Sequence, residues 1–120
     1  PDSGGAGQYR GGCGARRVWR VLGNTARGAV CSERSKSPPF GLAGGQAGSP
    51  MRIQLEDPDG TIRHPLSKGA FTVPAEGRIV FEVPGSGGYG PPSKRDARAL
   101  ADDIKNGYVT KAAARRDYDR

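Results

Sequence analysis

The chain has 120 residues, of which 20 are Gly and 10 are Pro. A quarter of the chain therefore consists of residues that interrupt regular structure and cannot fill a core. Leu, Ile, Val and Phe together contribute 19 residues, about 16 % of the chain, whereas a typical globular domain has at least roughly 20 %. This composition excludes a large self-sufficient core, so we expect a partner subunit to supply buried surface.

Short apolar runs exclude a membrane-spanning helix, and the first ten residues lack the apolar centre of a signal peptide. We therefore expect a cytoplasmic protein without a membrane partner. Cys13, Cys31 and His64 are too few for a zinc site within the chain, because structural zinc takes four ligands. We expect no metal site and two reduced cysteines, with a disulfide as the alternative.

The net charge is +7, and residues 1–50 carry seven Lys or Arg against two acidic residues. A basic segment of this kind is compatible with nucleic-acid binding. Only two aromatic residues, Tyr9 and Trp19, are interleaved with the arginines of this segment. Two aromatic side chains are too few to stack with successive bases of a nucleic acid. The favoured interpretation is an acidic partner surface or solvated strand edges.

The first half of the chain predicts loops and one hairpin. Residues 1–15 contain six glycines and are predicted to be a loop. Residues 16–22 partly alternate basic and apolar side chains, which predicts a strand that ends at Gly23. Residues 29–32 are its expected antiparallel partner, and the turn-forming residues 35–50 follow.

The next segment predicts short strands. Residues 51–56 and 61–64 flank the tract Asp57-Pro58-Asp59-Gly60, which is a strong turn signal between strands. Residues 78–83 are the best strand candidate. That strand opens into the glycine-rich residues 85–90, which we expect to cross tightly toward a helix, with an anion held by their backbone N–H groups as an alternative.

The last 28 residues predict a helical hairpin. Ser93 is the expected cap of a first helix with Asp96 in its first turn, and Gly107 is expected to end it. Its predicted buried face contains Ala97, Leu100, Ala101 and Ile104. Thr110 caps a second helix, Val109 and Ala114 can form a hydrophobic staple, and the expected bulky anchors are Tyr108 and Tyr118.

Classical catalytic patterns are sparse. His64 precedes Pro65 and is compatible either with a general base or with a solvent-facing turn residue, which is the favoured interpretation. Asp102 and Asp103 are adjacent on the predicted helix, and their side chains therefore diverge instead of forming a carboxylate pair. With a single histidine, the sequence gives no basis for predicting a Ser/His/Asp or Cys/His catalytic arrangement.

Three glycine tracts carry a resemblance to a known family. They are PDSGGAGQYRGGCGARR at residues 1–17, PFGLAGGQAG at 39–48, and VPGSGGYGPPSKRDARALADDIKNGYVTKAAARRDY at 83–118. Their sequence and order resemble the carboxyl-terminal region of the hydantoinase B/oxoprolinase family, and the resemblance covers nearly the whole chain. From the predicted elements we expect an α+β fold, with short antiparallel strands and long glycine-rich loops followed by a carboxyl-terminal helical hairpin, and without a self-sufficient core.

The resemblance implies a small subunit or carboxyl-terminal fragment of a larger ATP-dependent complex. The favoured function is a multi-subunit ketone carboxylase similar to acetophenone carboxylase, and the alternative is a hydantoinase or 5-oxoprolinase that hydrolyses a cyclic amide. A basic nucleic-acid-binding accessory protein is the remaining alternative. The expected partners are an A-type, ATP-using subunit and a larger B-type subunit, which would hold ATP and a divalent metal. We expect this chain to bind no cofactor and to lack catalysis alone.

Two sets of residues follow as site candidates. The glycine tracts suggest loops that approach a substrate closely and exclude water, or that thread through an interface where a Cβ would clash. The loop candidates are Gly87, Gly88, Tyr89, Ser3, Gly4, Gly5 and Arg10, and the interface candidates are Leu100, Ile104 and Tyr118. We expect residues 1–92 and 93–120 to form one partial domain that a partner completes.

Overall fold

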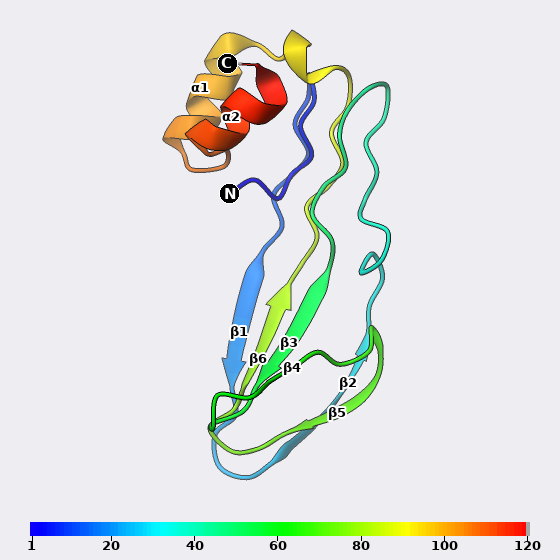
Figure 1. The fold of residues 1–120 in the computed structure, drawn as a ribbon, viewed down its shortest axis with the longest axis vertical. Coiled ribbons are helices and arrows are strands. Elements are labelled where there is room, and N and C mark those ends of the chain that lie inside the picture. The colour runs from blue at the N-terminus through cyan, green and yellow to red at the C-terminus, as the bar shows by residue number, and fades with distance from the viewer. Residues whose placement is uncertain (120) are drawn as a thin grey trace.

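The computed structural model describes residues 1–119. The molecule is elongated, with extents of 52 × 26 × 17 Å, and Figure 1 shows helices at one end, strands at the other and long extended segments between them. The predicted α+β class is confirmed. The elements are β1 (Arg16–Arg20), β2 (Ala26–Cys31), β3 (Arg52–Glu56), β4 (Ile62–Arg63), β5 (Lys68–Val73), β6 (Arg78–Glu82), the 3-10 helix η1 (Pro92–Lys94), α1 (Ala97–Lys105) and α2 (Lys111–Tyr118).

The strands form two antiparallel sheets. Four strands lie in the order β1-β6-β3-β4, and β2 pairs with β5 in a second sheet. The predicted hairpin between residues 16–22 and 29–32 is therefore wrong, although both segments contain strands. Val21 exchanges backbone hydrogen bonds with the turn before β6, donating to Gly77 O at 2.9 Å and accepting from Glu76 N at 2.9 Å. These bonds hold the end of β1 beside β6, and the chain then crosses to the other layer.

Strand β5 was missing from the predicted elements. Its sequence, KGAFTV, contains Gly69 and Ala70, and small residues of this kind give little alternation of large apolar and polar side chains. The strand forms because Phe71 and Val73 contribute to the interior, where Val73 is fully buried. Tertiary packing therefore decides this element.

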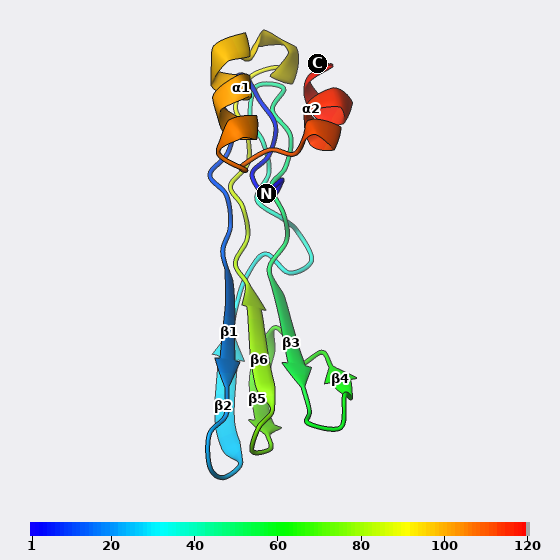
Figure 2. The same cartoon turned by 90° about the vertical axis from the view of Figure 1, so that its left-hand side faces the viewer.

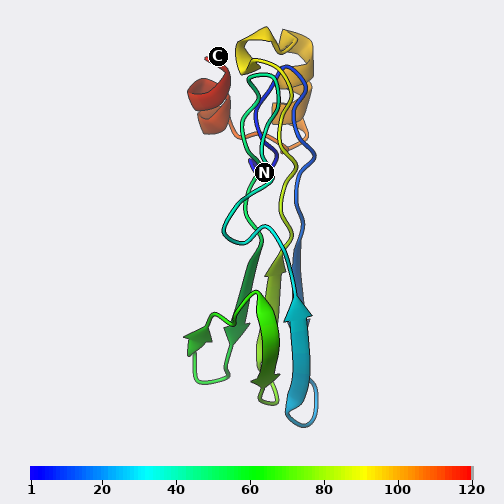
Figure 3. The ribbon, with the colours of Figure 1, turned by 90° about the vertical axis from the view of Figure 1, so that its right-hand side faces the viewer.

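The two sheets face each other and enclose two small apolar clusters (Figures 2 and 3). One contains Val21, Leu55 and Val73, and the other contains Val30, Met51 and Ile53. Phe71 packs against both clusters. Opposite it, Gly28 has no side chain, and a Cβ there would meet the Phe71 ring.

Basic residues on the strands are partly neutralised across the sheet. Arg16 on β1 lies 3.9 Å from Glu82 on β6, and Arg78 on β6 lies 3.9 Å from Glu56 on β3. These side chains are opposite one another in the strand register. Arginines of β1 and β6 thus lie beside acidic groups of the neighbouring strands.

The helical hairpin forms with a different first cap from the one predicted. Asp96, and not Ser93, caps α1, and its carboxylate accepts a hydrogen bond from Ala99 N at 2.9 Å. Ser93 instead lies in η1, which starts directly after Pro91. Gly107 adopts φ 75°, which suits the residue after a helix, and Thr110 caps α2 as predicted.

The helices bury one cluster with the first glycine tract. It contains Ala6, Leu100, Val109, Ala113, Ala114 and Tyr118, with Ile104 packed against it. The predicted face is correct for Leu100 and Ile104 but wrong for Ala97 and Ala101, which are exposed. Tyr108 is also exposed and does not anchor the hairpin. Neither helix within residues 1–119 is long and apolar enough to cross a membrane.

Candidate functional site

The glycine tracts lie side by side between the sheets and the helices. We call residues 3–14, 39–48 and 83–90 the glycine bundle. Gly5 N donates to Ser86 O at 2.8 Å, Gln46 N to Ala6 O at 2.7 Å and Gly88 N to Gln46 O at 2.9 Å. Each tract is therefore hydrogen-bonded to the other two, and Figure 3 shows these extended segments running together toward the helices.

Glycine is required here because backbone packs directly on backbone. A Cβ on Gly88 would meet the carbonyl of Ala6, and one on Gly87 would meet the carbonyl of Phe40. No positive φ contributes at these two positions, so the requirement is one of space. The same contact with a neighbouring carbonyl oxygen occurs at Gly4, Gly5, Gly11, Gly14, Gly41, Gly45, Gly48 and Gly85.

Most N–H groups of residues 85–90 already have partners in the glycine bundle or in Ser49, which directly follows its second tract. Gly85 N donates to Ser49 Oγ at 3.0 Å, and Ser86 N donates to Gly12 O at 2.9 Å. The N–H groups of Gly88, Tyr89 and Gly90 donate to carbonyl oxygens of the neighbouring tracts. The geometry therefore favours the packing interpretation of this loop over an anion-binding one.

Ser3 and Arg10, the polar loop candidates, also make internal contacts. Ser3 Oγ accepts a hydrogen bond from Gly14 N at 2.9 Å. Arg10 Nε lies 3.1 Å from Asp103 Oδ2 on α1, and its guanidinium lies over the Tyr108 ring at 5.2 Å from the centroid. Arg10 thus joins the glycine bundle to the helices.

Asp103 is the buried charge that sequence analysis missed. Its Oδ2 also accepts from Arg95 Nη2 at 2.6 Å, so two guanidinium groups share one carboxylate oxygen. Burial opposes the charge of Arg10, but the hydrogen bond and attraction of Asp103 outweigh it and raise the pKa of Arg10. Asp103 lies three residues after Leu100, and this spacing was the available signal that it shares the buried helix face.

The three interface candidates lie close together in the helical cluster. Leu100 and Tyr118 are each 3 % exposed, and Ile104 packs beside them. Their burial comes from the helices and from Ala6 of the glycine bundle. Contact with a partner is therefore not what covers Leu100 and Tyr118.

An apolar row is exposed on the glycine bundle. Tyr9 and Tyr89 are paired in antiparallel fashion with ring centroids 6.3 Å apart, and Leu42 is paired with Tyr89 in parallel. The three side chains are between 54 % and 65 % exposed. Among Gly87, Gly88 and Tyr89 of the predicted loop, Tyr89 is thus the residue with a side chain exposed on the bundle surface.

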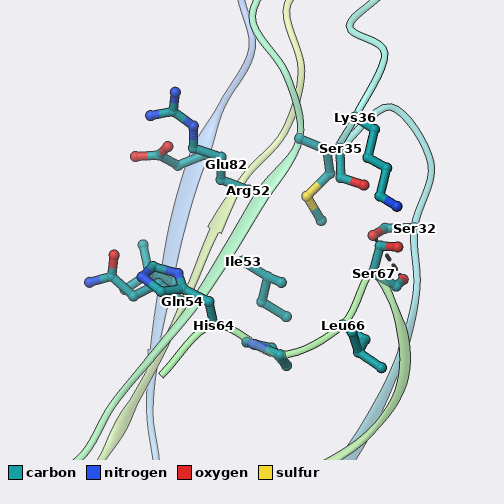
Figure 4. A pocket seen from close by; sticks show the side chains of 13 residues that line it. Ser32, Ser35, Lys36, Arg52, Ile53, Gln54, His64, Leu66, Ser67 and Glu82 are labelled. Carbon is teal, nitrogen blue, oxygen red and sulfur yellow. Dashed lines mark hydrogen bonds between the residues drawn. The ribbon is translucent and has the colours of Figure 1, made fainter. Parts of the chain in front are cut away.

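A cavity of about 670 Å³ lies at the other end of the molecule, beside β3. Figure 4 shows Ile53 of β3 across it from Leu66 and from Ser67, which accepts a hydrogen bond from Ser32. His64 also lines it. The volume of this cavity is within the range of ligand-sized pockets. Neither Cys13 nor Cys31 lines the cavity, and both are free and exposed.

Comparison with known proteins identifies the family. The model of the hydantoinase B/oxoprolinase family matches residues 1–92. The chain belongs to the hydantoinase B/oxoprolinase family. The predicted resemblance is confirmed, and the match includes all three tracts of the glycine bundle and all six strands.

Curated relatives extend the similarity to almost the whole chain. The uncharacterized protein MJ0963 of Methanocaldococcus jannaschii is 32 % identical over 98 % of this chain and 20 % of its own length. The caprolactamase subunit beta of Pseudomonas jessenii is 31 % identical over 98 % of this chain and 21 % of its own length. The chain therefore spans about a fifth of the length of these relatives.

Two solved structures have the same fold over this region. The ATP-dependent caprolactamase of Pseudomonas jessenii superposes with a TM-score of 0.77 at 29 % identity and covers 98 % of this chain, which spans 21 % of that chain. A nucleotide-free acetone carboxylase superposes with a TM-score of 0.76 at 25 % identity over 98 % of this chain and 20 % of its own. The fold of this hydantoinase B-type chain is thus shared by a caprolactamase and an acetone carboxylase.

Proposed function

We propose that this chain is the carboxyl-terminal part of a B-type subunit in an ATP-dependent complex that hydrolyses a cyclic amide. The observation that carries the proposal is the 31 % identity to a caprolactamase beta subunit over 98 % of the chain. That alignment includes the glycine bundle together with the helices locked to it by Asp103. ATP and a divalent metal would be held by the A-type subunit and by the rest of the B-type subunit.

The role proposed for the chain is structural. Its glycines bring backbone segments into direct contact, and its buried ion pairs attach the helices to that bundle. A rigid scaffold of this kind can hold neighbouring catalytic segments in place. Tyr89 remains our candidate for contact with a neighbouring chain or segment, since it is exposed on the bundle surface.

ATP-dependent ketone carboxylation is the second candidate function. It is favoured by the structural likeness to acetone carboxylase, with a TM-score of 0.76. An aryl ketone such as acetophenone is a substrate hypothesis within this second candidate. The two functions differ in co-substrate, because carboxylation consumes bicarbonate and amide hydrolysis does not.

The test is purification of the native complex through a tag on the polypeptide that contains this chain. We expect an A-type subunit to co-elute, and ATP hydrolysis to rise with a panel of lactams, hydantoins and 5-oxoproline without bicarbonate. Stimulation by ketones only when bicarbonate is present would replace the first function with the second. A polypeptide that elutes without an ATP-using subunit would contradict both.

A further inference from the structure

The edge of β3 is incompletely paired. Strand β3 lies between β6 and β4, but β4 has two residues, and its pairing stops at Leu55↔Arg63. Continuing the same register would place Ile53 opposite Pro65. Proline has no N–H to donate to a ladder, and at this point the chain leaves β3 and moves toward β5.

The backbone hydrogen bonds show which peptide groups face this edge. Val83 N donates to Ala15 on the β1 side at 2.7 Å, so the odd residues of β6 face β1 and the even ones face β3. The partners of those even residues are Arg52, Gln54 and Glu56. The remaining residues of β3, including Ile53, must then face the edge beside β4.

A second observation supports the same orientation. Met51 N donates to Arg34 O at 3.0 Å and Asp57 N donates to Thr61 O at 2.8 Å, both on the side away from β6. Ile53 lies between these two bonded positions. Within residues 1–119, no backbone hydrogen bond outside the sheets reaches the N–H or C=O of Ile53.

The cavity adjoins this unpaired stretch. It is lined by β3 on one side and by the segments around Ser32 and Leu66 on the other (Figure 4). Buried peptide groups are normally hydrogen-bonded, and an open strand edge is where an extended segment can add to a sheet. A volume of about 670 Å³ leaves room for several residues of such a segment.

The charges around the cavity indicate what kind of segment fits. Lys36 and Arg52 line it, and neither forms an ion pair with any described residue. Glu82 is the acidic group in the lining, and Arg16 lies 3.9 Å from its carboxylate. The rest of the lining contains apolar side chains, including Met51 and Leu66, together with uncharged polar ones, including Gln54 and three serines. A segment with alternating apolar and acidic side chains matches this lining.

We infer that an extended, acidic segment from the remainder of the B-type polypeptide adds to β3 at Ile53 and occupies this cavity. The source is indicated by length, because relatives that align with 98 % of this chain are about five times longer. The inference rests on the proposed function for the identity of the larger polypeptide. It goes further in assigning the place and the character of one contact.

The experiment uses the purified complex. The photoreactive amino acid p-benzoylphenylalanine replaces Leu66, which is 79 % exposed and lines the cavity, or as a control Leu22, which is 76 % exposed and lies outside it. We expect the probe at 66 to cross-link one acidic segment of the larger polypeptide outside these 120 residues. The probe at 22 should not label that segment.

Two further measurements use the same complex. Hydrogen exchange of the Ile53 amide should be within about tenfold of that of the Leu55 amide, which is paired to β4. Reversing both cavity charges with Lys36→Glu and Arg52→Glu should lower the cross-link yield at position 66 at least about fivefold. Reversing two exposed cations of α2, with Lys111→Glu and Arg115→Glu, should leave the yield unchanged.

Different results would contradict the docking of an acidic segment at β3 and the proposed function of the complex. An active complex whose Ile53 amide exchanges freely, or whose cross-links from position 66 remain within this chain or join a second copy of it, overturns the inference and leaves the proposed function intact. A cross-linked segment that is basic also overturns it. Failure of the larger polypeptide to associate with an ATP-using subunit contradicts the proposed function, while a cross-link to its acidic segment would still support the inference.

Discussion

Arg10 Nε donates a hydrogen bond to Asp103 Oδ2 over 3.1 Å, which joins two residues separated by 93 positions in the chain. The bond connects the first glycine tract to α1, and Arg95 donates to the same oxygen from the segment before that helix. The three side chains are at most 15 % exposed. Water therefore solvates their charges poorly, and the Asp103 carboxylate and the two guanidinium groups stabilise each other instead. The attachment of the helices to the bundle therefore depends on Asp103.

Asp103→Asn should destabilise the helical end strongly. The substitution leaves two largely buried guanidinium groups without their carboxylate, which costs about 3 kcal/mol. Asp102→Asn is the matched control, because Asp102 is exposed on the same helix, and its effect should be within about 0.5 kcal/mol. Urea unfolding of the polypeptide that contains the chain and hydrogen exchange of the α1 amides measure the stability change in each variant. Equal changes in the two variants would show that the ion pairs do not hold the helix.

Gly88→Ala should disrupt the glycine bundle. The added Cβ would meet the backbone of Ala6 and Gly5, and backbone of this kind has no flexible end that can move aside, so we expect a loss of about 2 kcal/mol or more. Gly12→Ala is the control, since the nearest atom to its added Cβ is Ser86 Oγ at 3.7 Å. Thermal unfolding and ATP-dependent turnover of the complex compare the two.

The outcome at Gly88 also separates structure from catalysis. If the Gly88→Ala complex is as stable as the unsubstituted protein but loses turnover, the loop has a direct role in the site. If stability and turnover fall together, the loop acts through packing, as its engaged N–H groups indicate. A variant unchanged in both would contradict the close backbone contact.

The isolated chain should not unfold cooperatively. Within residues 1–119, twelve of the thirteen buried apolar residues are divided among three small clusters, and eleven large hydrophobic side chains are exposed. Small separated clusters give little stabilisation against the conformational entropy of 120 residues. Circular dichroism during heating of the purified chain tests this; a sharp two-state transition of the monomer would show that no partner surface is required.

Local sequence signals predicted the elements better than their pairing. The turn at residues 57–60 and the helix end at Gly107 follow from residue chemistry within a few positions, and both are confirmed. The partner of β1 is decided instead by residues around Gly77, more than 50 positions away, which hold Val21 in place. Short strands with mixed charged and apolar residues carry no signal for that choice.

The candidate site shows the same division. Glycine content predicted close approach at Gly87 and Gly88, but not whether the neighbour would be a substrate or another backbone segment. The structure places carbonyl groups of Phe40 and Ala6 there. Asp103 was misjudged because adjacent positions on a helix were compared only with each other, whereas its partners come from residues before the helix and from the first tract.

Leu100→Asp should detach the helices from the glycine bundle. Leu100 is 3 % exposed among Ala6, Val109 and Tyr118, and an unpaired carboxylate there would cost several kcal/mol, on the order of the largest single-substitution effects. Leu22→Asp places the same charge at an exposed turn and should change stability by about 0.5 kcal/mol or less. Limited proteolysis of the polypeptide between β6 and α1 reports detachment; equal resistance in the two variants would contradict the packing of this helix.

Tyr118 should make the helical end sensitive to alkaline pH. Burial raises the pKa of its phenol above the usual value of 10.0, because the ionised form is poorly solvated in the helical cluster. Because the pKa of Tyr118 is higher in the folded state than in the unfolded state, its neutral phenol contributes fully to stability below about pH 10. This contribution is lost as the pH rises from about 10 through the pKa of the folded state. Urea unfolding of the containing polypeptide at several pH values should therefore show falling stability of α2 above about pH 10. Tyr118→Phe removes the ionisation and should flatten that decline, whereas Tyr108→Phe changes an exposed tyrosine and should not. A decline that persists unchanged in Tyr118→Phe would assign the alkaline sensitivity to groups outside this cluster.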